Sequence, residues 1–382
     1  MIRSDFLPLT RPHIGNKELS AVADIIRSGW WTTGPKVQEF ERKFGAFLKE
    51  DETLFVTALN SCSSGMFLTL KALGIGPGDE VIVPTWTFAA SAQVVEWTGA
   101  VPILCDIEGL SLGIDVAETE KRISSRTKAI IAVHIGGYPC NLAGITALAE
   151  KFDLKVIEDA AHAIGTRYNG TKIGNFSDAT CFSFYATKNL AMGEGGAVVS
   201  KDKKLITKIE KLTYFGINKE AFKRYEKSGQ WRYDIEELGY KCNLDSIHAA
   251  LGLAQLQKIE SFNARRRNIA QTYKLHLDKS ISYTEDSKTH YHTFHLFQIL
   301  LSEKVDRDNF IQKLKQVNIG SSVHFIPLHQ HSYFRKHQID AVFPIADEIF
   351  ERIVSIPMFP AMTDKDVEYA IHNINQIIRR IS

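Results

Sequence analysis

Short apolar runs alternate with helix-like segments from about residue 55 to residue 200. The runs at 81–84, 101–105, 129–133 and 155–157 are nearly continuous in apolar residues, which is typical of strands that are buried on both faces. Between them, residues 141–152 carry apolar side chains at helical spacing. This alternation predicts an α/β fold with a mostly parallel sheet that is flanked by helices.

The pattern changes after about residue 260. Residues 265–277 indicate a helix with a polar face, residues 291–301 a strand, and residues 308–317 a further helix. A capping-box-like start at Thr363 opens the last helix. The buried face of that helix is expected to carry Val367, Ile371, Ile374, Ile378 and Ile381.

Length and composition suit a chain of two domains. With 382 residues and 44% hydrophobic content, the chain can bury a large core. The change of pattern divides it into a large domain over residues 1–258 and a smaller C-terminal α+β domain over residues 259–382. The formal net charge of +2 comes from 46 basic and 44 acidic residues without a basic block, which argues against nucleic acid as a partner.

The chain shows no sequence signal for export or for a membrane. Its first residues lack the apolar core of a signal peptide, and no apolar run approaches the roughly 20 residues that a membrane span needs. The five cysteines are scattered, without a Cys-x-x-Cys pair or a disulfide framework. We therefore expect a cytoplasmic globular protein.

Lys188 lies in a sequence setting that suggests covalent chemistry. It follows an apolar, strand-like run and precedes the Gly-rich turn 193–196, so the backbone can direct its amine toward an aldehyde. A second strand-like run ends in the carboxylate of Asp159. A lysine that forms an imine and an acid that faces a pyridine nitrogen are what pyridoxal phosphate (PLP) requires of a protein. We predict that Lys188 and Asp159 are catalytic.

Two groups of small polar residues are suited to the phosphate of this cofactor. Ser61, Cys62 and Ser63 open a predicted helix, whose first N–H groups and positive dipole end bind anions. Ordinary N-capping by Ser61 or Ser63 is the alternative. Ser183 can supply a further hydroxyl, whereas the glycines of residues 74–78 lack dinucleotide-binding spacing and indicate a turn.

The pyridine ring of the cofactor needs contacts on its face and its edge. Phe88 follows a predicted strand and is the first candidate for stacking on the ring, with Trp86 second; core packing is the alternative for either side chain. His162 is a candidate for contact with the phenolic oxygen. For Asp159, an alternative and compatible role is to cap a helix over residues 160–163.

Several motifs together resemble the DegT/StrS-type PLP-dependent sugar aminotransferases. They are SGWWTTGP (28–35), GDEVIVP (78–84), VHIGG (133–137), EDAAH (158–162), FSFYATK (182–188), GEGG (193–196), GYKCNL (239–244) and AALGLAQL (249–256). The resemblance implies the fold-type I aminotransferase fold, a PLP cofactor and a homodimer with active sites between the subunits. It also implies that Asn243, or alternatively Lys241, reaches the cofactor phosphate of the neighbouring subunit.

The chain departs from the common family pattern in three places. SCSS at 61–64 replaces the more usual SGTA, His162 replaces Gln, and Cys242 replaces an aromatic residue. None of these changes removes a catalytic group, but each affects the detailed geometry around the cofactor.

The segment 319–333 resembles the branch of the family that aminates C4 of UDP-linked 4-ketosugars, as in the pathways to 4-amino-4-deoxy-L-arabinose and pseudaminic acid. This resemblance implies L-glutamate as amino donor, a nucleotide-linked ketosugar as acceptor and a role in bacterial surface polysaccharide synthesis. The residues predicted to bind the substrate are Trp31, Thr33, Tyr185, His329, Trp231 and Arg232. The last two belong to a loop over residues 216–238 that is rich in basic side chains.

The histidines of the C-terminal domain do not indicate a metal site. His324, His329 and His331 have no accompanying ligand helix, so no metal is expected. His290, His292 and His295 alternate as on a strand, and we expect no chemical role for them.

Three other functions compete with this interpretation. Amination at C3 of a dTDP- or GDP-linked sugar uses the same machinery and remains an alternative. PLP-dependent sugar dehydration is disfavoured, because related dehydratases carry histidine where this chain has Lys188. A PLP-binding regulator needs a DNA-reading segment, for which the residues before Asp5 leave no room.

Overall fold

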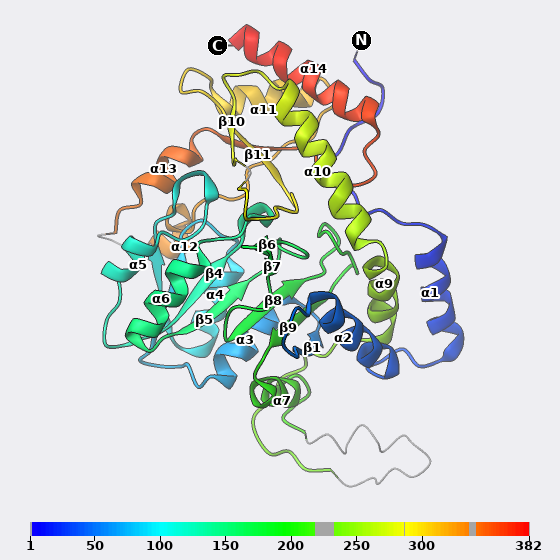
Figure 1. Ribbon diagram of the computed structural model, residues 1–382, viewed down its shortest axis with the longest axis vertical. Coiled ribbons are helices and arrows are strands. Elements are labelled where there is room, and N and C mark those ends of the chain that lie inside the picture. The colour runs from blue at the N-terminus through cyan, green and yellow to red at the C-terminus, as the bar shows by residue number, and fades with distance from the viewer. Residues whose placement is uncertain (1, 218–232, 286, 336–340, 382) are drawn as a thin grey trace.

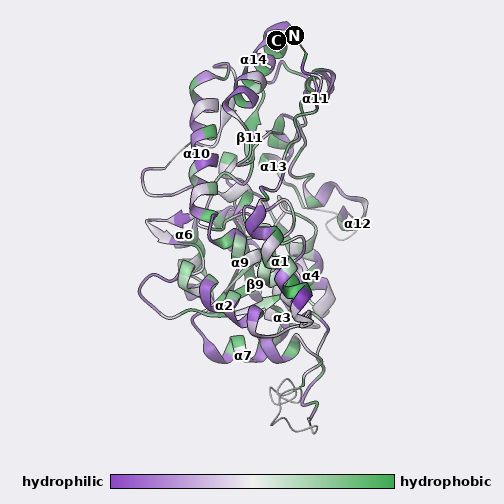
Figure 2. Ribbon diagram, turned by 90° about the vertical axis from the view of Figure 1, so that its right-hand side faces the viewer, coloured by the Kyte–Doolittle hydropathy of each residue, from purple (hydrophilic) through white to green (hydrophobic). Residues whose placement is uncertain are grey.

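The computed structural model describes residues 2–217, 233–285, 287–335 and 341–381 (Figure 1). The chain forms a large α/β part and a smaller part that carries the C-terminal helix α14 (Asp364–Ile381). The first and the last described residues both lie at the end of the smaller part that points away from the large part (Figure 1 and Figure 2).

Seven strands form the central sheet of the large part. In spatial order they are β1 (Phe55–Leu59), β9 (Gly196–Ser200), β8 (Ala179–Ser183), β5 (Lys155–Asp159), β4 (Thr127–Val133), β2 (Glu80–Pro84) and β3 (Val101–Cys105). Within this sheet β9 alone runs against its neighbours, so the prediction of a mostly parallel sheet is confirmed. The carboxyl ends of the other six strands and the first residue of β9 therefore lie along one edge.

Alternate residues of the strands point into two separate hydrophobic layers. In β2, Val81 and Val83 belong to one layer and Ile82 to the other. The first layer is covered by α3 (Cys62–Ala72), α4 (Ala90–Thr98) and α7 (Lys203–Leu212), and the second by α2 (Pro35–Leu48), α6 (Leu142–Phe152) and α9 (Ser246–Leu256). Figure 2 shows hydrophilic and hydrophobic residues alternating along α7, as expected of a helix with one buried face.

Further elements complete the large part. They are α1 (Asn16–Ser28), α5 (Val116–Lys121), β6 (Arg167–Tyr168), β7 (Thr171–Lys172) and the 3-10 helices η1 (Gly109–Ser111) and η2 (Ile135–Gly137).

The smaller part has an antiparallel sheet of its own, with β10 (Ser282–Tyr283), β11 (Phe297–Leu300) and β12 (Ile353–Ile356). Around it lie α10 (Ile259–His276), α11 (Arg307–Gln316) and α14. The buried residues of η3 (Leu328–Gln330), α12 (Ser332–Arg335) and α13 (Pro344–Phe350) belong instead to the first hydrophobic layer of the large part.

Two sequence predictions for the smaller part need correction. The strand expected over residues 291–301 is too long, because β11 begins only at Phe297. Upstream of it the chain turns toward the large part, where His295 Nδ1 lies 3.1 Å from Asn189 Oδ1. The expected apolar face of α14 is buried, except that Ile381 is only half-buried at the end of the helix.

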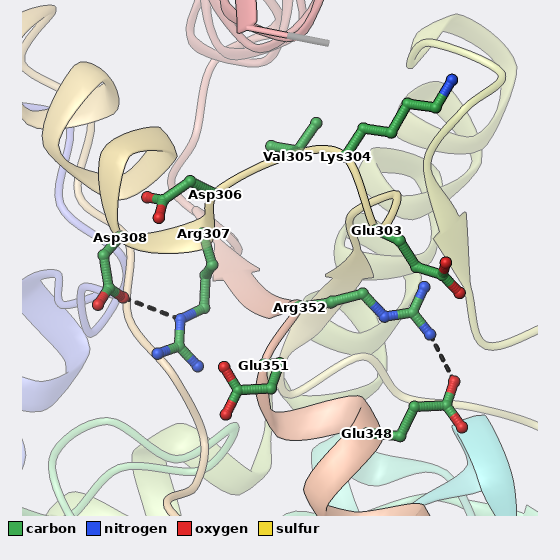
Figure 3. Close-up of a pocket in the computed structure, with 9 residues that line it drawn as sticks. All are labelled: Glu303, Lys304, Val305, Asp306, Arg307, Asp308, Glu348, Glu351 and Arg352. Carbon is green, nitrogen blue, oxygen red and sulfur yellow. Dashed lines mark hydrogen bonds and ion pairs between the residues drawn. The ribbon is translucent and has the colours of Figure 1, made fainter.

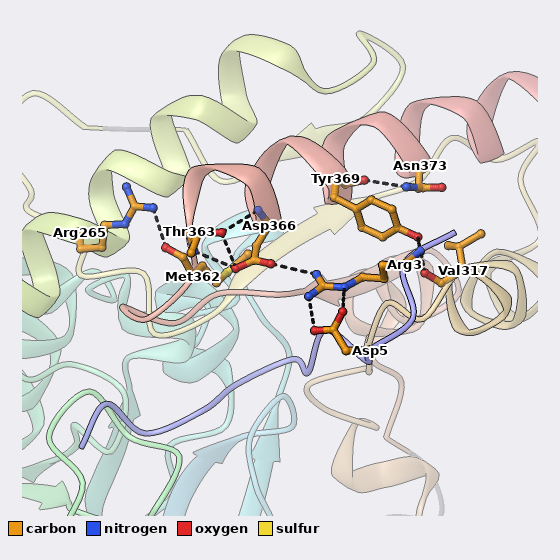
Figure 4. A network of polar contacts seen from close by, with 9 residues as sticks. All are labelled: Arg3, Asp5, Arg265, Val317, Met362, Thr363, Asp366, Tyr369 and Asn373. Carbon is orange, nitrogen blue, oxygen red and sulfur yellow. Dashed lines mark hydrogen bonds and ion pairs between the residues drawn. The ribbon is translucent and has the colours of Figure 1, made fainter. Parts of the chain in front are cut away.

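The N-terminal segment crosses to the smaller part (Figure 4). Arg3 Nη1 lies 2.9 Å from Asp366 Oδ1 on α14, and the Arg3 backbone N–H donates to the Tyr369 hydroxyl at 3.2 Å. Leu7 is buried in the hydrophobic core of the smaller part. A boundary between residues 258 and 259 remains our proposal, since α10 begins at Ile259, but the first residues pack with the second unit.

The first residue of β9 lies directly against the start of α3. A Cβ atom on Gly196 would stand 2.3 Å from the carbonyl carbon of Ser61 and 2.5 Å from the amide nitrogen of Cys62. Backbone atoms would have to move to make room for it. The close approach of these two segments therefore requires glycine at this position.

Replacing Gly196 with alanine is expected to lower the unfolding free energy of the apoprotein by about 1–3 kcal/mol, the usual cost of forcing extra atoms into a packed site. Urea denaturation followed by circular dichroism would show a lower midpoint. Gly76→Ala is the control, because its Cβ would lie 3.5 Å from the nearest atom, the Thr98 carbonyl oxygen. Equal midpoints for the two variants would contradict the close approach.

Candidate active site

Polar and aromatic side chains from several strand ends lie along the carboxyl edge of the sheet. Ser61 follows β1, Phe88 follows β2, Asp159 ends β5, Ser183 ends β8, and Lys188 lies in the turn between β8 and β9. Because parallel strands end at the same edge, ligands of open α/β sheets bind there. The fold thus places most of the expected cofactor contacts at one edge.

The turn that carries Lys188 is fixed by backbone hydrogen bonds. The Lys188 N–H donates to the Tyr185 carbonyl at 2.9 Å, and the Ala186 N–H donates to the Gly193 carbonyl at 3.0 Å. Burial lowers the pKa of the Lys188 amine to about 8, while Asp159 acts in the opposite direction. Near neutral pH, far more of this amine is uncharged than of an ordinary lysine, and only an uncharged amine attacks an aldehyde.

Asp159 is buried, and both of its carboxylate oxygens accept hydrogen bonds. Oδ2 accepts from the Ser91 hydroxyl at 2.7 Å, and Oδ1 accepts from the Ala161 N–H at 3.1 Å. The residues after Asp159 form turns, so the alternative that it caps a helix over residues 160–163 is wrong. Asp159 lies near enough to Lys188 to raise the pKa of its amine, against the larger effect of burial.

His162 packs against His295, with ring centroids 4.2 Å apart. The Gly136 N–H donates to His162 Nδ1 at 3.2 Å, so the proton of the neutral ring is on Nε2. Burial holds the pKa of both histidines well below the usual value, and the positive charge of Lys188 lowers each further. A neutral ring with an Nε2–H is a hydrogen-bond donor, which suits the contact expected between His162 and a phenolic oxygen.

The start of α3 has the features of an anion site. Ser61 is the N-cap residue, and its Oγ accepts from the Ser64 N–H at 3.1 Å, so the capping role considered for Ser61 is confirmed. The N–H groups of Cys62 and Ser63 belong to the first turn, where a helix has no acceptors of its own for them. The positive end of the helix dipole lies there as well.

Ser183 lies beside this helix start. It pairs with Gly196 of β9, while the adjacent Gly195 forms a bridge with Ser61. The hydroxyls of Ser61 and Ser183 and the N-terminus of α3 therefore lie around the glycines at 195 and 196. Together with the Lys188 amine and the Asp159 carboxylate, this set of groups fits the phosphate, the aldehyde and the ring nitrogen of PLP.

The two aromatic candidates at the end of β2 have different surroundings. Trp86 is 0% exposed, and its Nε1–H donates to the His324 carbonyl at 3.0 Å, which makes it a core residue. Phe88 is 62% exposed and has the Phe325 ring as a neighbour, with centroids 5.7 Å apart. Phe88 is therefore the candidate with a free ring face.

Thr33 and Asn243 lie side by side, although both are far from Lys188 in the sequence. Asn243 Nδ2 lies 2.5 Å from Thr33 Oγ1, and Lys241 Nζ lies 2.5 Å from Asn243 Oδ1. The half-exposed Trp31 precedes this pair, with its Nε1–H donating to the Ile26 carbonyl at 3.2 Å. Thr33, expected from the sequence to contact the substrate, and Asn243, expected to contact a phosphate, are thus half-buried neighbours.

The histidines of the tail segment have different contacts. His329 Nδ1 lies 2.7 Å from Thr85 Oγ1 and its Nε2 lies 2.8 Å from Asp347 Oδ1, so both ring nitrogens are bonded within the chain. His329 therefore fastens the tail to the end of β2. His324 Nδ1 lies 3.0 Å from Ser355 Oγ, and burial, followed by the charge of Lys188, lowers the pKa of His324 to about 4.

Some predicted contacts lie elsewhere, and some were missed. Tyr185 is exposed in the turn before Lys188, whereas Trp231 and Arg232 lie outside the described residues. Ser91 and His295 were not predicted as site residues, and His324 was predicted only as part of the segment 319–333. The contacts of Ser91 and His295 join segments far apart in the chain, and no local motif marks these two residues.

Figure 3 shows an open hollow of about 590 Å³ that is not the cofactor site. It lies in the smaller part, between the start of α11 and the end of α13, and its arginines are paired: Arg307 with Asp308 and Arg352 with Glu348. None of its lining residues belongs to the strand ends. In the described residues, no helix is long and apolar enough to cross a membrane, and no three potential metal ligands are grouped.

Comparison with known proteins assigns the chain to a family. A profile of the DegT/DnrJ/EryC1/StrS aminotransferase family matches residues 12–375. The spore coat polysaccharide biosynthesis protein SpsC of Bacillus subtilis is 42% identical over 387 residues, covering 99% of this chain and 98% of that protein.

Solved structures agree. The putative sugar aminotransferase Spr1654 from Streptococcus pneumoniae, in its PMP form, has a TM-score of 0.92 at 30% identity, covering 98% of this chain and 100% of that one. Its PLP form also matches, with a TM-score of 0.90 at 29% identity, covering 99% of this chain and 100% of that one. PseC from Helicobacter pylori, an aminotransferase involved in the biosynthesis of pseudoaminic acid, has a TM-score of 0.91 at 25% identity, covering 98% and 100%.

These matches confirm three predictions from the sequence: the family, the fold-type I architecture and the PLP cofactor. The site residues fit that cofactor, as described above. The chain belongs to the DegT/DnrJ/EryC1/StrS aminotransferase family and is a PLP-dependent sugar aminotransferase.

Proposed function

We propose that this enzyme transfers an amino group from L-glutamate to C4 of a nucleotide-linked 4-ketosugar, with UDP as the favoured carrier, for surface polysaccharide synthesis. One observation carries the proposal. The tail segment whose sequence resembles the C4 branch is fastened to the cofactor edge, through His329 to Thr85 and through the His324 carbonyl to Trp86. These contacts support the proposal, because a segment fastened to the cofactor edge is suited to line the site of an acceptor sugar.

Two relatives support the biological setting. SpsC carries polysaccharide biosynthesis in its name, and PseC acts in the biosynthesis of pseudoaminic acid. Amination at C3 of a dTDP- or GDP-sugar remains the alternative, because the residues at the sheet edge would serve either carbon. Dehydration is disfavoured by Lys188, the group that a transaminase needs for proton transfer.

When bound, PLP carries the amino group between the two substrates and withdraws electrons from the reacting carbon. The chain supplies the remaining chemistry. Lys188 would hold the aldehyde group, and its amine, with a pKa of about 8, can both accept and return a proton near neutral pH. The Asp159 carboxylate would interact with the ring nitrogen, and the neutral His162 would donate from Nε2 to the phenolic oxygen.

We also propose a homodimer in which Asn243 acts on the cofactor phosphate of the partner subunit. In support, the half-buried Asn243 side chain contacts Thr33 and the exposed Lys241. Trp30 and Trp31, two large aromatic residues that precede Thr33, are about half exposed in the single chain. A partner subunit would cover such a surface.

The substrate assignment is tested with a panel of nucleotide ketosugars. The enzyme is incubated with glutamate, PLP and UDP-, dTDP- or GDP-linked 4-keto and 3-keto sugars, and mass spectrometry and NMR identify the product. We expect fastest conversion of a UDP-linked 4-ketosugar to the 4-amino sugar. Preferred amination at C3, or of a dTDP-sugar, would contradict the proposal and leave the sugar aminotransferase activity intact.

His329→Ala should slow the ketosugar half-reaction more than the glutamate half-reaction, because it releases the tail from Thr85. Single-turnover measurements separate the two. His331→Ala is the matched control, since His331 is exposed on the same segment. Equal slowing of both half-reactions by His329→Ala would show that the tail supports the fold and does not position the sugar.

Shared active sites are tested by mixing two inactive variants. A Lys188→Ala chain and an Asn243→Ala chain, combined under conditions that exchange subunits, should regain part of the activity. Each mixed dimer then has one site with both native residues. Native mass spectrometry of tagged chains verifies the exchange. Mixed dimers without activity would place Asn243 outside the partner's site.

A further inference from the structure

The carboxylate of Asp159 is the end of a chain of buried hydroxyl groups. Ser91 Oγ lies 2.7 Å from Asp159 Oδ2, and Thr87 Oγ1 lies 2.7 Å from Ser91 Oγ. Thr87, Ser91 and Asp159 are 1%, 0% and 6% exposed, so water has almost no access to these bonds.

The direction of hydrogen-bond donation along these hydroxyls follows from the number of protons that they carry. An ionised carboxylate only accepts hydrogen bonds, so the single hydroxyl proton of Ser91 is committed to Asp159. The Ser91 oxygen must then accept from Thr87. Donation runs from Thr87 to Ser91 to Asp159, and consecutive bonds of this kind strengthen one another in a buried setting.

The second carboxylate oxygen of Asp159, Oδ1, has one backbone hydrogen bond and one long contact with a thiol. Asp159 Oδ1 accepts from the Ala161 N–H at 3.1 Å. Cys62 Sγ is 3.8 Å from the same oxygen but 3.4 Å from the Cys181 carbonyl, so its proton is shared. The Ser91 hydroxyl is therefore the one short side-chain donor to Asp159 among the described residues.

The hydrogen-bonded hydroxyls also connect Asp159 to the turn after β2, on the other side of the site. Thr87 precedes Phe88, the candidate for stacking on the ring, in the turn after β2. That turn is anchored by Trp86 to the His324 carbonyl and by Thr85 to His329. Ser91 lies in the first turn of α4. The turn and the helix together fix where the carboxylate points.

We propose that Thr87 and Ser91 are positioning residues that keep Asp159 ionised and aimed at the ring nitrogen of the cofactor; this rests on the proposed role of Asp159. Hydrogen bonds to a carboxylate favour its charged form. Without them, the proton between nitrogen and carboxylate moves toward the carboxylate. The ring then withdraws fewer electrons, and proton transfer slows while substrate binding is little changed.

The test compares Ser91→Ala and Thr87→Val with Thr87→Ser, which keeps the hydroxyl. Three readouts are used: the pH dependence of the visible absorbance of bound cofactor, the dissociation constant of the cofactor, and kcat and KM for glutamate. Ser91→Ala should shift the absorbance titration and lower kcat about tenfold or more, the loss expected for a hydrogen bond to a charged group, with KM changed less than about twofold. Thr87→Val should shift the absorbance titration and lower kcat less than Ser91→Ala does. Thr87→Ser should match the unmodified enzyme in both properties.

Thr98→Val is the structural control, because the Thr98 hydroxyl lies on the same helix and donates to the Val95 carbonyl at 2.7 Å. It should change the melting temperature without moving the absorbance titration. Asp159→Asn completes the series. If Asp159→Asn changes the titration and Ser91→Ala does not, the positioning role is wrong and the proposed function stands. If Asp159→Asn changes neither titration nor turnover, the proposed role of Asp159 itself fails.

Discussion

The common direction of six strands in the central sheet is the constraint on which the rest of the site depends. It brings Ser61, Asp159 and Ser183, which end or follow three different strands, to one edge. The antiparallel β9 completes that edge, because its first residue, Gly196, packs against the start of α3 with no room for a side chain. The turn between β8 and β9 then presents Lys188 to the same place. Each functional group is positioned by backbone pairing, which leaves little freedom for the site to rearrange.

Burial sets the charges of this site. It lowers the pKa of Lys188 to about 8 and that of His324 to about 4, and it keeps His162 and His295 neutral. The three histidines are therefore uncharged near neutral pH, whereas Lys188, with a pKa of about 8, keeps a larger uncharged fraction than an ordinary lysine, and Asp159 supplies the carboxylate beside them. A fixed carboxylate in such a poorly hydrated place can act strongly on the ring nitrogen of a cofactor. The hydroxyls of Ser91 and Thr87 compensate for the water that the carboxylate lacks.

The sequence allowed the fold to be predicted where a local pattern had one physical cause. Buried parallel strands require continuous apolar runs, and a lysine before a Gly-rich turn with a carboxylate at a strand end matches the needs of PLP. Long-range contacts could not be predicted in this way. Phe88 was predicted as the first candidate for stacking and Trp86, two residues away, as the second, with core packing open for either; only the folded chain buries Trp86 and exposes Phe88. His295 was expected to lie on a strand, and its contact with His162 depends on where a loop of the smaller part meets the sheet edge.

The central claim is that burial at the strand edge makes Lys188 a reactive amine. The most direct measurement is the rate at which the apoprotein captures PLP as a function of pH, followed by visible absorbance, with borohydride reduction and peptide mapping to identify the lysine. The account predicts that the label is on Lys188 and that the rate rises with pH to a midpoint near 8, because the amine loses its proton there. In Asp159→Asn the midpoint should fall further, since Asp159 favours the charged amine. A midpoint near the ordinary lysine value of 10.5, or a label on another lysine, would contradict the account.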